Sequence, residues 1–359
     1  MLQYILYILI AVILFGLLIA VHEFGHFFTA KLLGVKVNEF AVGMGPRILH
    51  KVRGETEYSL RLLPIGGFCA MEGEDEETDD PRSFACQPGW KKFLILVAGS
   101  FMNFVAGVLI ILVLFSQAVS FSSPVITGFM DGAEHLTQGG LREGDIFYRV
   151  DGHRTYFTGD VSLYLGRAGD FMEVEVIRDG ARIRLENFDF SAKVPVVDEN
   201  GQTVYMRGIY FGKAEAATPW LVVRNTWYQA LDCVRTVWLS LGDLVTGRTG
   251  VRELSGVIGI VDAVGDAGAS AATAAEGLQS VFSFMSLIAI NLAVMNMLPI
   301  PALDGGRVFF LIVGGVFRLI AGRKLDPKYE NAVNVAGFVL LMGLMILVAV
   351  SDVLKIAGV

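Results

Sequence analysis

Four uncharged, strongly apolar stretches constrain the fold of this 359-residue chain more than any other feature. They are residues 1–21, 93–115, 277–303 and 331–351, and none contains Asp, Glu, Lys or Arg. A helix needs ~20 apolar residues to cross the ~30 Å hydrocarbon core of a bilayer. Each stretch meets this requirement, whereas the apolar run 308–317 is too short to cross alone. We therefore expect a polytopic α-helical membrane protein with four transmembrane helices.

Basic residues predict the orientation of these helices, because Lys and Arg in short loops stay on the cytoplasmic side. They lie in the connections between the first and second spans and between the third and fourth, and include Lys31, Lys36, Lys91, Lys92, Arg323, Lys324 and Lys328. Residues 116–141 contain none. We therefore expect a multi-pass protein of the inner (cytoplasmic) membrane of a cell, with both termini and the region 116–276 outside the cytoplasm. The first and third spans then run in the same direction.

The net charge of −7 comes from one short segment. Lys and Arg number 29 and Asp and Glu 36, and seven of these acids lie within residues 72–80. Elsewhere the two signs balance, so the chain has no basic field that would hold nucleic acid phosphates. We expect the lipid bilayer, and no nucleic acid, among its partners. The acidic segment is typical of a solvated cytoplasmic loop, with a gate or a partner-binding patch as the alternative.

Residues 122–190 differ from the apolar stretches, because they contain short runs of alternating hydrophobicity that end in Asp-Gly. Two such runs, 144–152 and 173–180, predict β-hairpins of a small domain. The order of glycine turns, strands and a helix-like stretch resembles a bacterial PDZ domain, which binds an extended chain end by strand addition. Another small β-rich domain is the alternative. Further along, residues 218–247 predict an amphipathic helix with three tryptophans, which lies on the outer membrane face or packs on the small domain.

The sequence His22-Glu23-Phe24-Gly25-His26, at the cytoplasmic end of the first span, carries the strongest chemical signal. Positions i and i+4 of a helix share a face, so both imidazoles can bind one Zn²⁺. Glu23 then lies beside the open coordination position and can take a proton from water. Ionisable groups in a membrane helix are costly and usually functional. We therefore expect His22 and His26 to bind zinc and Glu23 to be catalytic.

A catalytic zinc usually has three protein ligands, so a third must come from elsewhere in the chain. Asp304 follows the third span and is the only acidic residue between Glu276 and Asp326. Because the first and third spans run in the same direction, Asp304 lies at the same membrane side as the two histidines. We expect Asp304 to complete the metal site. A helix-terminating aspartate in a Gly-Gly turn is the alternative.

Three features together resemble the site-2 protease family of intramembrane zinc metalloproteases, in its bacterial four-span form. They are His22-Glu23-x-x-His26, the motif Asn296-x-x-Pro299-x-Pro301-x-Leu303-Asp304-Gly305, and the PDZ-like domain between them. The resemblance implies Zn²⁺ bound by the two histidines and Asp304, Glu23 as general base, and Asn296 as a residue that holds the substrate backbone. The asparagines at positions 103 and 291, also at membrane depth, are expected to form interhelical hydrogen bonds, with a direct catalytic role as the alternative.

The segment Gly66-Gly67-Phe68 resembles the membrane-dipping β-hairpin of the same family, whose edge presents a strand to the substrate. The resemblance therefore implies that Gly66 and Gly67 bind substrate. Two segments depart from the family pattern, because Ser100 stands where the family often has proline and residues 255–257 lack an expected proline. Neither departure involves an expected zinc ligand, so it puts only local loop geometry in doubt.

These observations predict four parts of the chain. Residues 1–116 and 277–359 form the two halves of the membrane core, 122–190 the PDZ-like domain, and 191–276 an extracytoplasmic connector with the interfacial helix. The family resemblance implies hydrolysis of peptide bonds in transmembrane segments of single-span membrane proteins, such as anti-sigma factors or signal-peptide remnants. The alternatives are a PDZ-bearing membrane scaffold with a structural or vestigial metal site, and a small transporter, which the absence of an inverted-repeat pattern disfavours.

Overall fold

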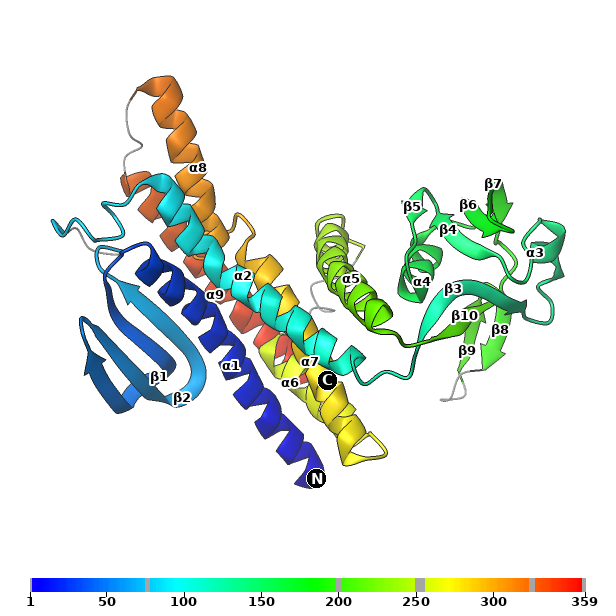
Figure 1. Cartoon of the computed structure of the whole chain (residues 1–359), viewed down its shortest axis with the longest axis horizontal. Helices are drawn as coiled ribbons and strands as arrows, with labels where there is room; N and C mark the ends of the chain where they lie inside the picture. Colours follow the sequence, from blue (N-terminus) through cyan, green and yellow to red (C-terminus); the bar gives the residue numbers. More distant parts are fainter. Residues whose placement is uncertain (1, 75–77, 198–201, 249–255, 323–326, 357–359) are drawn as a thin grey trace. The chain divides into compact units, whose positions relative to one another are not determined.

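The computed structural model describes residues 2–74, 78–197, 202–248, 256–322 and 327–356. Three acids of the segment 72–80, the basic residues Arg323 and Lys324, and Ser255 lie outside these ranges. The chain divides into two compact units (Figure 1). One, a helical unit, is formed by Met1–Leu114 and Cys233–Val359, and the other, a β-rich unit, by Phe115–Asp232.

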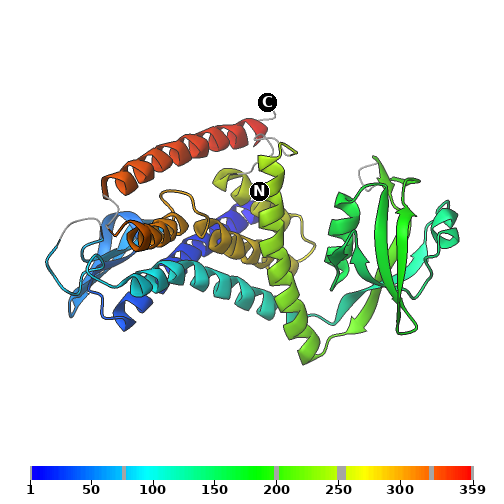
Figure 2. The same cartoon turned by 90° about the horizontal axis from the view of Figure 1, so that it is seen from above.

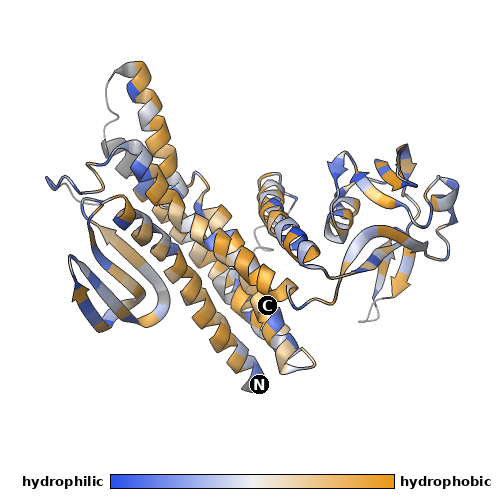
Figure 3. Cartoon of the chain, in the orientation of Figure 1, coloured by the Kyte–Doolittle hydropathy of each residue, from blue (hydrophilic) through white to orange (hydrophobic). Residues whose placement is uncertain are grey.

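Four long helices of the helical unit coincide with the expected spans. They are α1 (Leu2–Leu32), α2 (Gly89–Phe115), α7 (Ala274–Asn296) and α9 (Pro327–Ile356). All four are long and apolar enough to cross a membrane. Hydrophobic residues predominate along these helices (Figure 3). Large apolar side chains remain exposed on them, for example Ile13 at 62% and Leu340 at 71%. Exposed apolar surface of this kind suits lipid rather than water, so the prediction of a polytopic helical membrane protein is confirmed.

Two shorter helices, α6 (Val257–Ala269) and α8 (Asp304–Ala321), also belong to this unit. Helix α6 is not among the elements expected from the sequence, and it packs between α1 and α7. Val264 of α6 is fully buried in one cluster with Tyr7 of α1 and Val281 of α7. Close approach requires glycine in α6, because a Cβ at Gly268 would lie 2.6 Å from Cγ of Tyr7.

A buried carboxylate joins α9 to the beginning of α6. Asp352 is 1% exposed, and its Oδ2 accepts hydrogen bonds from the backbone N–H groups of Gly256 at 2.9 Å and Gly259 at 3.0 Å. The first N–H groups of a helix have no partner within the helix. Asp352 therefore satisfies two of them from another helix, which fixes α6 within the helical unit.

A β-hairpin lies against α1, formed by β1 (Val37–Arg53) and β2 (Thr56–Met71) (Figures 1 and 2). Residues 39–42 pair with 67–70 on one side and with 57–60 on the other. The segment 67–71 is therefore an edge of this small sheet, since no further described strand pairs with it. The approach of the hairpin to α1 depends on Gly16, because a Cβ there would lie 2.2 Å from the carbonyl oxygen of Pro64.

Three described acidic side chains of the segment 72–80 are ion-paired, namely those of Glu72, Glu74 and Asp80. Lys36 Nζ lies 3.0 Å from Glu72 Oε2, and Asn38 Nδ2 donates to the same oxygen at 3.0 Å. These hydrogen bonds, the one from Lys36 above all, hold the pKa of Glu72 below its usual value. Glu74 pairs with Arg307 of α8. The described part of the acidic segment is thus attached both to the start of the hairpin and to the helix that begins at Asp304.

The β-rich unit has an antiparallel sheet in the order β10-β3-β4-β6-β7. Its strands are β3 (Ser120–Phe129), β4 (Ile146–Val150), β6 (Phe171–Arg178), β7 (Ala181–Asp189) and β10 (Ile209–Ala216), with β5 (His153–Arg154) beside β4. A separate pair is formed by β8 (Val194–Val197) and β9 (Thr203–Met206), and the helices are α3 (Glu134–Gln138), α4 (Thr158–Arg167) and the start of α5 (Pro219–Val245).

Both Asp-Gly hairpins expected in this unit are confirmed. Asp151 and Gly152 join β4 to β5, with φ angles of 49° and 77°. Asp179 and Gly180 join β6 to β7, with φ angles of 49° and 80°. Two consecutive residues with positive φ suit the type I′ turn, which favours Asp-Gly. The expected amphipathic helix after residue 218 is also present, as α5.

Candidate metal centre

Helix α1 brings His22 and His26 together on one buried face. The two side chains are one helical turn apart, and their Nε2 atoms lie 3.2 Å from each other. Both residues are at most 9% exposed. Two imidazole nitrogens at this separation in an apolar surrounding can share one cation.

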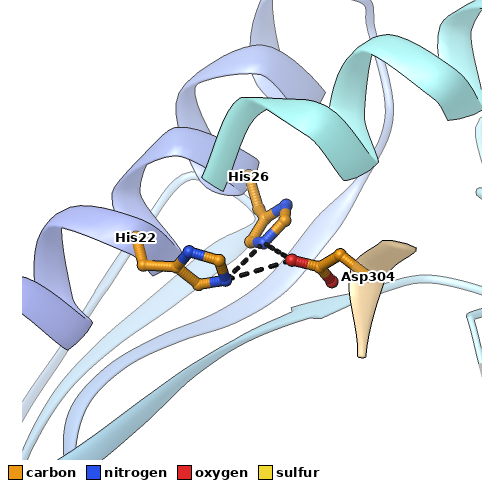
Figure 4. A group of neighbouring side chains, drawn as sticks. All are labelled: His22, His26 and Asp304. Carbon is orange, nitrogen blue, oxygen red and sulfur yellow. Dashed lines mark hydrogen bonds and ion pairs between the residues drawn. The ribbon is translucent and has the colours of Figure 1, made fainter. Parts of the chain in front are cut away.

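Asp304, the first residue of α8, completes the cluster (Figure 4). Its Oδ2 lies 3.1 Å from Nε2 of His22 and 3.2 Å from Nε2 of His26. The three side chains come from two helices and point toward one another in the figure. The structure therefore brings together the three residues that the sequence analysis selects as a metal site.

A tight turn between α7 and α8 puts Asp304 in this position. Ala302 has a φ of 72°, and the two glycines after Asp304 pack against the backbone of the turn. A Cβ at Gly305 would lie 2.3 Å from the carbonyl oxygen of Leu298, and one at Gly306 would lie 2.3 Å from that of Ile300. The glycines of the motif are thus needed for close approach, which is the local reason that the sequence folds this way.

Helix α2 also contacts the cluster, a feature not expected from the sequence. The carbonyl oxygen of Ile95 lies 2.8 Å from Nδ1 of His26. A Cβ at Gly99 would lie 2.3 Å from Nε2 of the same histidine. In turn, a Cβ at Gly25 of α1 would lie 2.4 Å from the carbonyl oxygen of Ala98. Small residues at facing positions of two spans are the sequence signal for such an approach.

These residues fit a zinc ion. The candidate ligand atoms of His22, His26 and Asp304 all lie within 4.8 Å of one another, and no other group of three His, Cys, Asp or Glu side chains in the described ranges comes this close. Two imidazole nitrogens and one carboxylate oxygen form a donor set typical of catalytic zinc, with a position left open. Gly99 keeps the space beside Nε2 of His26 free of any side chain.

Glu23 lies between the cluster and the hairpin edge. Its half-buried carboxylate lies near the backbone of Cys69 on β2. A Cβ at Gly67 would lie 3.4 Å from Cγ of Glu23, and Gly66 has a φ of 92°, which favours glycine. The structure thus brings Gly67 close to Glu23, whereas a Cβ at Gly66 would meet the side chain of Met44.

Asn296 is the last residue of α7 and is half-buried. Among the hydrogen bonds that the described residues form, none joins its side chain to His22, His26 or Asp304. The structure therefore places Asn296 before the turn that leads to Asp304 without assigning it a partner in the cluster.

Comparison with known proteins gives a family for nearly the whole chain. Residues 10–344 match the model of peptidase family M50. A protein of Clostridium perfringens named "Putative zinc metalloprotease" is 35% identical over 97% of this chain and 99% of its own length. A protein of the same name from Clostridium acetobutylicum is 34% identical over 96% of this chain and 97% of its own. The "Regulator of sigma-W protease RasP" of Bacillus subtilis is 26% identical over 96% and 97%.

Four findings lead to the same family: the family match, the full-length relatives, the four apolar helices, and the cluster of two histidines and one aspartate. The chain therefore belongs to peptidase family M50, the site-2 protease family, and is a multi-pass intramembrane zinc metalloprotease.

Proposed function

We propose that this protease cleaves the transmembrane segments of single-span membrane proteins, with His22, His26 and Asp304 as zinc ligands and Glu23 as general base. The observation that carries the proposal is the convergence of the three ligand atoms within a helical unit of four apolar helices, beside the edge of a β-hairpin. Anti-sigma factors and signal-peptide remnants are substrates of the proposed kind. The relative named "Regulator of sigma-W protease RasP" favours the first.

The chemistry divides between the ion and the chain. A zinc ion held by the three side chains supplies Lewis acidity, which polarises the scissile carbonyl and makes water a stronger acid. Glu23 takes a proton from the attacking water and returns it to the leaving amine. The Glu23 carboxylate lies near the backbone of Cys69, at the hairpin edge that is proposed to bind the substrate.

The hairpin edge presents the substrate. Transmembrane helices hide their peptide bonds in internal hydrogen bonds, so a segment must unwind before it can be cut. The edge segment 67–71 offers backbone groups for strand pairing with an unwound chain, and Gly67 brings that edge beside Glu23. We assign Asn296, at the end of α7, to holding the substrate backbone near Asp304.

The β-rich unit acts as a docking or size filter. The proposed PDZ-like domain at 122–190 needs β10 as well, because β10 pairs with β3 between Ile209 and Ala216. Both β10 and β7 end the sheet, and an end strand can add an extended chain. We propose that this unit and both termini lie outside the cytoplasm of a cell's inner membrane, because the basic loops face the cytoplasm.

A scaffold with a structural metal site fits these observations less well. A structural zinc is usually closed by a fourth Cys or His ligand. In the described part of the chain the metal cluster has two histidines and one aspartate and no such fourth residue. The open position suits a catalytic ion.

Glu23→Gln is expected to lower cleavage of a single-span model substrate in detergent by about 10²–10⁴-fold, because the amide cannot take a proton. The zinc content is expected to stay at the wild-type level, since Glu23 is not a ligand. Glu143→Gln, at an exposed position before β4, is the matched control and should cleave normally. Wild-type turnover by Glu23→Gln would contradict the mechanism.

Asp304→Asn is expected to lower both zinc occupancy and cleavage, because it removes the ligand charge with almost no change in shape. Metal analysis after dialysis measures occupancy. Asp131→Asn, an exposed position of the other unit, should retain zinc. If the Asp304 variant keeps its zinc and its activity, the third ligand is another residue.

Gly67→Val is expected to lower cleavage while zinc stays bound, since the new side chain would crowd Glu23 and the backbone at Ala41. Val52→Thr, on the far strand of the same hairpin, has an exposed side chain and serves as control. Equal cleavage by the Gly67 variant and this control would argue against substrate pairing at the 67–71 edge.

Replacing residues 120–216 by a flexible linker is expected to leave zinc bound and Glu23-dependent cleavage of a short single-span substrate intact. Substrate selection should change: substrates with bulky outer domains should become cleavable, or those that need a free chain end should be lost. A panel of substrates that differ only in the outer domain measures this. Loss of all proteolysis in a folded, zinc-loaded variant, or unchanged selection, would contradict the filter role.

A further inference from the structure

Helix α2 supplies none of the three candidate ligands, yet one of its faces contacts both histidines. Ile95, Gly99 and Asn103 are spaced four residues apart, so they lie along one side of the helix. Ile95 contacts Nδ1 of His26 through its carbonyl oxygen, and Gly99 leaves room for the imidazoles. At the third position, Nδ2 of Asn103 lies 3.5 Å from Nδ1 of His22.

A histidine that binds a metal through Nε2 needs a hydrogen-bond acceptor beside its other ring nitrogen, Nδ1. A histidine that binds a metal through Nε2 carries its proton on Nδ1, and this N–H donates to a neighbouring oxygen. For His26 that oxygen is the carbonyl of Ile95. For His22 the side chain of Asn103 is the one partner of Nδ1 among the hydrogen bonds of the described residues.

The burial of Asn103 indicates which end of the amide faces His22. Asn103 is 1% exposed, and its Oδ1 has no hydrogen-bond partner. A buried polar atom without a partner is costly. The two ends of an amide have nearly the same shape, so a half-turn of the group puts Oδ1 in place of Nδ2. Oδ1 then accepts the Nδ1–H of His22.

We propose that Asn103 is a positioning residue of the metal centre, whose side-chain oxygen accepts the Nδ1 proton of His22 and fixes the imidazole for zinc. The proposal rests on His22 as a zinc ligand. It gives Asn103 the function that the Ile95 carbonyl has for His26. A simple interhelical hydrogen bond between α1 and α2 would stabilise packing without affecting metal binding.

Three variants of the full-length protein test the proposal, with zinc affinity measured by competition with a chelator. Asn103→Leu keeps the branched shape and removes the acceptor, so zinc affinity should fall by about 10–100-fold. Asn103→Asp restores an acceptor oxygen and should bind zinc about as tightly as the wild type. Ser100→Ala is the matched control, because Ser100 is buried on the same helix and its hydroxyl has no partner. Its zinc affinity should not change.

The absorption spectrum of the cobalt-substituted protein provides a second readout that packing alone would not move. It should change in Asn103→Leu and stay like the wild type in Asn103→Asp and Ser100→Ala. Wild-type zinc affinity and an unchanged cobalt spectrum in Asn103→Leu would overturn the proposal. If Asn103→Leu does not fold, Asn103→Asp decides, and a clear loss of zinc affinity there would overturn it.

His22→Ala separates this inference from the proposed function. If that variant keeps zinc, the ligand assignment itself fails. If it loses zinc while Asn103→Leu keeps wild-type affinity, only the positioning function of Asn103 fails.

Discussion

Two buried imidazoles and a half-buried carboxylate are tolerated among apolar helices because they converge on one point, where a bound cation would neutralise the carboxylate and occupy the imidazole lone pairs. Each of these groups alone would be costly at this depth. The convergence requires α1 to present two side chains from one face and the turn after α7 to bring in Asp304. The arrangement of α1, α7 and α8 therefore follows from the need to satisfy these groups.

Close packing by glycine makes that convergence possible. Gly25 and Gly99 let α1 and α2 approach until a backbone carbonyl reaches His26, and Gly305 lets the turn fold back on Leu298. On the other side of α1, Gly67 brings the hairpin edge to Glu23. Rigid support on both sides matters for catalysis, because a general base and an electrophile must stay within hydrogen-bond reach of one water molecule.

The sequence predicts the features that depend on local patterns. Uncharged stretches of sufficient length predict the four spans, and Asp-Gly between alternating runs predicts the hairpins at residues 151–152 and 179–180. The spacing of His22 and His26 predicts a shared helix face, and the direction of the spans predicts that Asp304 joins them. Helix α6 has no such signal, since it is 13 residues long and carries Asp262 and Asp266. The contact between Asn103 and His22 joins residues 81 apart and depends on how α1 packs on α2. The pattern of residues in one sequence does not predict how these two helices pack on each other.

X-ray absorption at the zinc edge of the purified protein tests the central claim most directly, because it reports the ligand atoms without depending on a substrate. Two imidazole nitrogens at ~2.0–2.1 Å and carboxylate or water oxygen at ~2.0–2.2 Å, with no sulfur, are expected for a centre of His22, His26 and Asp304. The absence of sulfur is informative because the backbone of Cys69 lies near Glu23, so its buried thiol is a nearby alternative ligand. A sulfur shell at ~2.3 Å, or a protein that binds no zinc, would contradict the proposed centre.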